Sequence, residues 1–147
     1  PPILTQKDII IGHDNSQKAF QQYKLAFGKI FTDSFRHRAT KQDVEIFAEA
    51  MDAQDYERLK ALNPYLAGYD LEITQLKNLL VPPQLAPLHL EYINLVIAQK
   101  EVIRKLRDAG ADVVGATVTI AQYGTIQQRV SGLGQKFEDE YQKIGLP

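Results

Sequence analysis

His89 is the residue of this sequence best suited to chemistry, because an imidazole takes up and releases a proton near neutral pH. It lies in the most apolar segment, residues 88–98, where Asn94 is one of the few other polar residues. His13 and His37 lie elsewhere, and no Glu-x-x-His or His-x-x-x-His spacing gathers metal ligands on one helix face. We therefore predict a hydrogen-bonded core histidine, in a polar network with Asn94 or a tyrosine. A ligand-binding or proton-transfer role is the alternative.

Three carboxylates form a second candidate group. Glu45, Glu49 and Asp52 are spaced at i, i+4 and i+7, which places them on one face of a predicted helix. Carboxylates can bind calcium or act as acid and base, but calcium takes about six to eight oxygen ligands and no second acidic set converges here. We interpret the three as a solvated or partner-facing acidic surface, and so as a candidate interaction surface.

The other chemistry-bearing motifs are absent. The sequence has no glycine-rich phosphate loop, dinucleotide fingerprint or GxSxG elbow, and its lack of cysteine excludes thiolate zinc sites, iron–sulfur clusters and a thiol nucleophile. Most tyrosines and phenylalanines share the stripes of leucine and isoleucine and are attributed to the core, with Tyr65, Tyr69 and Tyr123 as candidates for a surface cluster. We predict no enzyme, and no cofactor or metal.

The composition is that of one ordinary globular domain of 147 residues. With 17 basic and 18 acidic side chains the net charge is -1, so no global field attracts nucleic acid. No stretch reaches the roughly 18 to 20 apolar residues of a membrane-spanning helix. The sequence begins at Pro1-Pro2 without an initiator methionine, from which we expect a preceding segment that holds a signal or an anchor.

Apolar residues at spacings of three and four predict helices along most of the chain. Residues 1–13 are expected to be an extended lead-in, because the isoleucines at 9–11 have no clear partner strand. A first helix should follow a cap at Asp14, Asn15 or Ser16 and end near Phe35. A second periodic segment should open with a capping box of Thr40 and Asp43 and run to residue 62.

Prolines and glycines divide the second half. Asn63-Pro64 should cap and start a third helix, and residues 81–87 form a proline-rich loop between helices. A fourth helix should have an apolar first half at the centre of the bundle and a charged second half, residues 100–108, in solvent. The fifth should begin at a cap, Asp112, and bend or pack closely at its glycines, above all Gly132 and Gly134. The prediction is an all-α fold: one antiparallel bundle of four to five helices over residues 1–147.

Two stretches carry a resemblance to a known family. Asp14-Asn15-Ser16 with residues 19–30, and Val81-Pro82-Pro83 with residues 88–94, are similar to segments of uncharacterised helical proteins from reduced-genome bacteria. In that family a PP-x-L-x-x-x-H-L element and a later tyrosine, matched here by Tyr123, recur in a domain outside the membrane behind an N-terminal anchor. The resemblance covers the first helix and the fourth to fifth. It implies an all-helical fold, an extracytoplasmic location and a structural polar network of His89, Asn94 and Tyr123, and it brings no catalytic residue.

These observations leave three functional hypotheses. The first is a non-enzymatic, extracytoplasmic structural or protein-interaction domain, tethered to a membrane through a segment before Pro1. The second is a cytosolic adaptor that binds a partner helix in a groove. The third is an enzyme or metal-binding bundle, which requires His89 within coordination distance of Glu45, Glu49 or Asp52. A large exposed apolar patch would favour either binding hypothesis over a purely structural role.

Overall fold

The computed structural model describes residues 3–36 and 42–146. In this part of the chain there are five α-helices: α1 (Gln17–Arg36), α2 (Asp43–Asp52), α3 (Asn63–Lys77), α4 (Ala86–Arg107) and α5 (Val113–Lys143). Short 3-10 helices cover Gln6–Asp8, Tyr56–Leu62 and Pro83–Leu85, and two-residue strands, β1 and β2, cover Ile10–Ile11 and Leu80–Val81. The predicted all-α bundle is confirmed.

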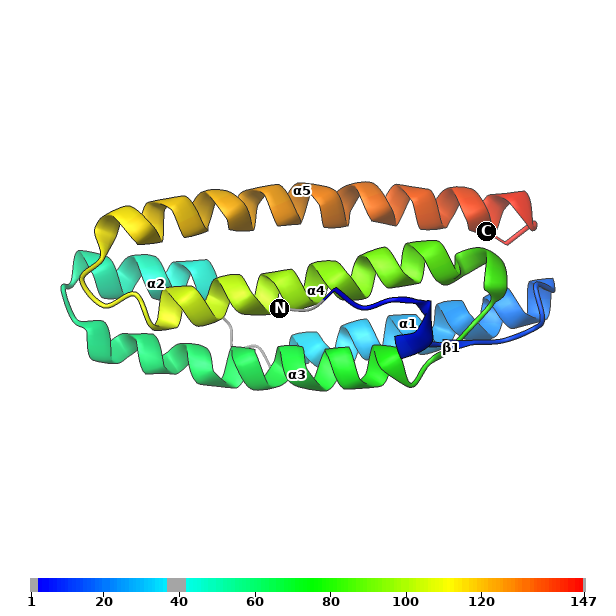
Figure 1. Cartoon of the computed structure of the whole chain (residues 1–147), viewed down its shortest axis with the longest axis horizontal. Helices are drawn as coiled ribbons and strands as arrows, with labels where there is room; N and C mark the ends of the chain where they lie inside the picture. Colours follow the sequence, from blue (N-terminus) through cyan, green and yellow to red (C-terminus); the bar gives the residue numbers. More distant parts are fainter. Residues whose placement is uncertain (1–2, 37–41, 147) are drawn as a thin grey trace.

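The helices lie along one long axis (Figure 1). The consecutive helices α3, α4 and α5 alternate in direction, and α1 and α2 lie behind them in this view. Apolar side chains from all five helices form one buried cluster. The predicted central position of the first half of α4 agrees with its packing, because His89, Tyr92, Ile93, Leu95 and Val96 are all buried.

The start of α1 follows the predicted capping chemistry. Ser16 Oγ accepts a hydrogen bond from the backbone amide of Ala19 at 3.2 Å, as an N-cap hydroxyl does. Asp14 Oδ1 accepts from the Ser16 amide at 2.7 Å, while Asn15 Oδ1 accepts from the amide of Gln84, 69 residues away, at 2.9 Å. The three candidate caps therefore divide between ending the lead-in, capping α1 and holding the loop before α4.

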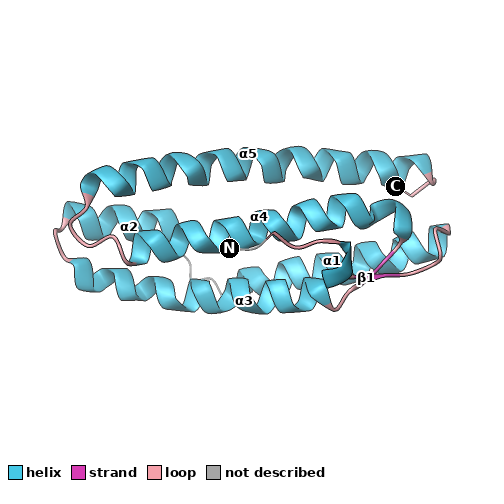
Figure 2. Ribbon diagram, in the orientation of Figure 1, coloured by secondary structure: helices cyan, strands magenta, loops and turns pink. Residues whose placement is uncertain are grey.

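The predicted partnerless lead-in is wrong in one respect. Ile10 and Ile11 pair in parallel with Leu80 and Val81, and the pairing continues where the Gly12 amide donates to the Val81 carbonyl at 2.8 Å. Figure 2 shows this contact at the end of the bundle where α3 passes into α4. The partner was missed because two paired residues leave no periodic signal, and because Val81 stands beside prolines that mark a loop.

The predicted second segment, residues 40–62, is not one helix. α2 ends at Asp52, Gln54 takes a left-handed conformation with φ of 50°, and a 3-10 helix over Tyr56–Leu62 leads into α3. Thr40 lies outside the described residues. The α2 start is instead held by Glu45, whose Oε2 accepts from the backbone amide of Gln42 at 3.2 Å.

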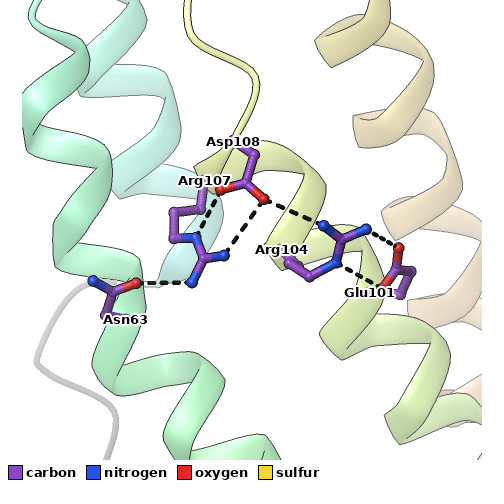
Figure 3. Close-up of polar contacts among 5 residues, drawn as sticks. All are labelled: Asn63, Glu101, Arg104, Arg107 and Asp108. Atoms are coloured by element: carbon purple, nitrogen blue, oxygen red, sulfur yellow. Dashed lines mark hydrogen bonds and ion pairs between the residues drawn. The ribbon is translucent and has the colours of Figure 1, made fainter.

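The second half of α4 is amphipathic, whereas we predicted that it would emerge into solvent. Val102, Ile103 and Leu106 are buried, and only the opposite side carries exposed charges. That side holds a chain of ion pairs in which Arg104 contacts both Glu101 and Asp108 (Figure 3). Arg107 joins Asp108 to Asn63 at the start of α3, with its Nη1 3.0 Å from Asn63 Oδ1. Asn63 thus ties α3 to α4, where we predicted a helix cap; no cap hydrogen bond from a side chain precedes α3.

The fifth helix is continuous from Val113 to Lys143. Asp112 caps it as predicted, accepting from the Gly115 amide at 2.9 Å, and Gly110 takes the left-handed conformation that ends the preceding segment, with φ of 54°. The helix runs unbroken through its later glycines, and the close packing expected at them is absent within it. A Cβ added at Gly124, Gly132 or Gly134 would meet nothing within 4 Å.

Candidate functional site

His89 lies at the centre of the bundle with both ring nitrogens in hydrogen bonds. Its Nε2 is 2.9 Å from the Leu76 carbonyl oxygen in the last turn of α3, and its Nδ1 is 2.9 Å from Tyr23 Oη on α1. Because a carbonyl only accepts, Nε2 carries the proton and Nδ1 accepts from the tyrosine hydroxyl. The ring is 0% exposed, and it joins α1, α3 and α4.

Aromatic side chains surround this hydrogen-bonded pair. The rings of Tyr23 and Phe27 meet His89 edge-on at centroid distances of 5.7 and 6.5 Å, and Tyr23 stacks on Phe137 of α5 at 6.2 Å. Burial lowers the pKa of His89 below its ordinary value, and the hydrogen bond to Leu76 opposes this shift only in part. Burial also raises the pKa of Tyr23 far above its ordinary value. Both groups are therefore neutral near pH 7.

The structure does not bring the predicted polar network together. Asn94 faces the lead-in, where its Oδ1 accepts from the Leu4 amide at 2.8 Å and its Nδ2 donates to the Leu4 carbonyl at 3.1 Å. Tyr123 donates from α5 to Asp43 at 3.0 Å. His89, Asn94 and Tyr123 therefore belong to three separate hydrogen-bonded groups.

Asp43 is a functional candidate that sequence reasoning took only for part of a cap. Its carboxylate is 3% exposed and joins three helices. Oδ2 accepts from Tyr69 of α3 at 2.8 Å, while Oδ1 accepts from Tyr123 of α5 at 3.0 Å and from the neighbouring Val44 amide at 2.9 Å. The capping pattern explained why an acid stands at the start of α2, and so gave no reason to look for tyrosine partners.

Glu72 is a second buried acid that the sequence reading missed. It is 2% exposed, and its Oε1 accepts from Tyr92 of α4 at 2.8 Å. A signal was present in the sequence: Glu72 follows Tyr69 by three residues and precedes Leu76 by four, so it lies on the apolar stripe of α3. An acid on such a stripe indicates a buried partner.

The predicted acidic surface is exposed, whereas two of the three tyrosines predicted to form a surface cluster are buried. Glu45, Glu49 and Asp52 are all exposed on α2, and the two ring nitrogens of His89 bond to Tyr23 and Leu76 rather than to any of them. Tyr65 and Tyr69 are 1% and 0% exposed, so they do not form a surface cluster. Within residues 3–36 and 42–146, no group of three or more His, Asp or Glu side chains is arranged to hold a metal ion.

The chemistry of this interior is that of mutual hydrogen bonding. His89 and Asp43 each accept from tyrosine hydroxyls that are themselves fixed by packing, and both are closed off from solvent by aromatic and aliphatic side chains. A general base must reach the proton that it removes from a substrate. The buried polar groups are therefore placed to orient helices.

The outward face of the first half of α5 is unusually apolar for an exposed surface. Residues 113–128 contain no charged side chain, although 24% of the whole chain is charged. Val114 is 78% exposed, Val113 64% and Val118 57%. We define the α5 face as these three valines with three exposed neighbours: Thr117, Ile120 and Ala121. Among the described residues, none of the helices combines the length and the hydrophobicity that a membrane span requires.

A groove between α4 and α5 is the second surface feature. Its volume is about 450 Å³, and its apolar lining includes Ile97, Ala98 and Val102 of α4 and Ile126 of α5. The lead-in residue Ile3 lines it beside Asn94, and charged residues of the second half of α4 line it further along. Cavities of roughly 300 to 1,000 Å³ with a mostly apolar lining are typical of small-molecule sites.

Comparison with known proteins adds no assignment to this geometry. The chain matches no family model, and neither a curated protein nor a solved structure matches it. A function is therefore inferred from the surfaces of the bundle.

Proposed function

We propose that this bundle is a non-enzymatic protein-interaction domain and that the α5 face is its binding surface. The observation that carries the proposal is the exposure of three valines within a run of 16 uncharged residues, 113–128. Exposed apolar side chains gathered on one helix face mark interaction sites more often than isolated ones do. Burying them against a partner stabilises the complex by roughly 25 cal/mol per Å² of apolar surface.

The chemistry of the face selects the kind of partner. A charged surface placed on residues 113–128 would lose hydration without gaining an ion pair. The partner that fits is a helix of another protein with apolar and small uncharged side chains at spacings of three and four, packed alongside α5. Thr117 and Ala121 are short, so they allow such a helix to approach closely.

A charge-insertion experiment tests this proposal. We expect Val114→Glu with Val118→Glu to abolish capture of the partner from cells of the source organism, because both positions are exposed and tolerate the change without unfolding. Gln135→Glu with Gln142→Glu is the matched control: it adds the same charge to exposed positions of the same helix, beyond the uncharged run. Titration of the purified partner against both variants and the unmodified domain completes the test.

Three outcomes are informative. Equal binding by both double variants and the unmodified domain would rule out the α5 face. Loss of binding only in the valine double variant supports it. Sedimentation of the purified domain over a range of concentrations separates a heterologous partner from a second copy of this chain, because only a second copy makes the sedimentation coefficient rise with concentration.

The extracytoplasmic location is part of the same proposal, with a tether to a membrane before Pro1. Its support is the resemblance carried by the Pro82-Pro83 element, His89 and Tyr123. Protease added to intact cells that produce the full-length protein should degrade this domain. Protection until the cells are lysed would instead favour the cytosolic adaptor.

A further inference from the structure

We propose that the groove between α4 and α5 binds an amphipathic carboxylate, a molecule with one long apolar chain and a single carboxylate group. The chain would lie over Ile97, Ala98, Val102 and Ile126, and the carboxylate would pair with Lys105 at one end. This site is separate from the α5 face, and it does not depend on the function proposed above.

The shape of the groove suits an elongated ligand. Its lining residues on α4 run from Asn94 to Lys105 at spacings of three and four, so they form one stripe along the helix. Eleven residues of α-helix correspond to about 16 Å. Ala98 stands at the middle of the stripe, where its short side chain leaves the space between α4 and α5 open.

The lead-in fixes one end of the groove. Two hydrogen bonds join Asn94 to the backbone of Leu4, so both polar atoms of this amide are already in use and the end is apolar in character. The adjacent Ile3 lines the groove and is 80% exposed. An apolar ligand chain in the groove would remove both the Ile3 side chain and the ligand's own apolar surface from water.

The other end carries an excess of one positive charge. Residues 101–108 contain three cations, Arg104, Lys105 and Arg107, and two acids, Glu101 and Asp108. Both acids are already in ion pairs with the arginines (Figure 3). Lys105 forms no ion pair within the described part of the chain, and it lines the groove.

The charge count also selects a monoanion. Glu101 lines the same groove and repels a ligand with two negative charges, while a single carboxylate matches Lys105, the one cation of residues 101–108 without an ion pair. The apolar floor excludes small hydrophilic acids, because they would leave it in contact with water. The class of ligand is thus a long-chain monocarboxylate.

The test uses dodecanoate, below its micelle concentration, and 1-dodecanol as its neutral counterpart, each titrated into the protein by calorimetry. We expect saturable binding of one dodecanoate per chain. Lys105→Gln should weaken dodecanoate by about three- to tenfold and leave dodecanol unchanged. Lys136→Gln, an exposed lysine on the second half of α5, is the matched control and should change neither ligand.

Two filling variants test the chain site. Ala98→Trp should abolish binding of both ligands, and Thr125→Trp does so from an exposed position of α5, so a folding defect at Ala98 cannot imitate the result. The proposal is overturned if dodecanoate does not bind, or if the tryptophan variants bind both ligands as the unmodified protein does. A helical peptide that binds in the groove while dodecanoate fails to compete with it would also overturn the proposal. So would an equal loss of affinity for both ligands in Lys105→Gln.

Discussion

Tyr23 on α1 and His89 on α4 share a buried hydrogen bond of 2.9 Å between Oη and Nδ1. The two residues are 66 positions apart, and neither ring nitrogen of His89 has room for a further partner once Leu76 accepts from Nε2. The pair therefore fixes α1 against α4 in one register, since a shift of either helix would leave a buried polar atom without its bond.

Removing the tyrosine hydroxyl tests the strength of this contact. We expect Tyr23→Phe to lower the free energy of unfolding by about 1 to 3 kcal/mol, because Nδ1 of His89 would stay buried without a donor. Urea denaturation followed by circular dichroism measures the change. Tyr56→Phe, at a position 36% exposed, is the control and should stay within about 0.5 kcal/mol. Equal effects of the two substitutions would contradict the assigned hydrogen bond.

The pH dependence of stability follows from the neutral state of His89. Burial lowers its pKa in the folded chain below the ordinary value of 6.5, so between the two pKa values the unfolded chain binds a proton that the folded chain does not. Stability contributed by the neutral ring is complete above about pH 6.5 and is lost as the pH falls below it.

Denaturation midpoints at about pH 7.5 and 5.5 measure this dependence. We expect the unmodified protein and His13→Asn, at an exposed histidine, to lose stability alike at the lower pH. His89→Gln should be less stable at both values and show a smaller difference between them. An unchanged difference in His89→Gln would assign the pH dependence to other groups.

Asp43 is expected to matter more for folding than the acids predicted from the sequence. Asp43→Ala removes the acceptor shared by Tyr69 and Tyr123 and should lower the free energy of unfolding by about 2 to 4 kcal/mol. Asp52→Ala, at the exposed end of the same helix, should change it by less than about 0.5 kcal/mol. Thermal unfolding of the two variants decides the matter, and similar melting temperatures would show that the carboxylate does not hold the three helices.

The glycines of α5 should respond to alanine in opposite directions. A Cβ at Gly124 meets nothing within 4 Å, so Gly124→Ala should stabilise the helix by about 0.5 to 1 kcal/mol. A Cβ at Gly115 would stand 2.3 Å from Asp112 Oδ2, so Gly115→Ala displaces the cap and should destabilise the protein by about 0.5 to 2 kcal/mol. Melting temperatures of Gly124→Ala and Gly115→Ala, each compared with that of the unmodified protein, test these two expectations. A higher melting temperature for Gly115→Ala would show that the Asp112 cap is dispensable.

Local signals accounted for much of the fold. The caps at Ser16 and Asp112 and the helices α1 and α3 were predicted correctly, because each depends on residues within one or two turns. The continuous helix through residues 113–120 was also predicted, despite its valines and threonines. The break after Asp52 was not, because the apolar spacing on either side of it suits an α-helix as well as a 3-10 helix.

The candidate site was much less predictable. His89 could be placed in the core from its apolar neighbours, but its partners, Tyr23 and the Leu76 carbonyl, lie on helices that only the packing brings to it. The role of Asp43 and the strand pairing of Ile10 with Leu80 depend on contacts across 26 to 80 residues. The local sequence pattern around a polar residue does not specify which distant side chain will be its hydrogen-bond partner.

The sequence by itself determined that this protein is a bundle of helices, where most of them begin and end, and that a long uncharged stretch opens the last one. It could do so because helix formation and capping depend on neighbours in the chain. Only the tertiary structure decided which tyrosines bond to His89 and Asp43, that the valines of α5 face outward, and that a groove opens beside Lys105. Those features depend on the relative placement of whole helices. A pattern with a period of 3.6 residues indicates which face of a helix is buried, but it does not indicate which other helix packs against that face.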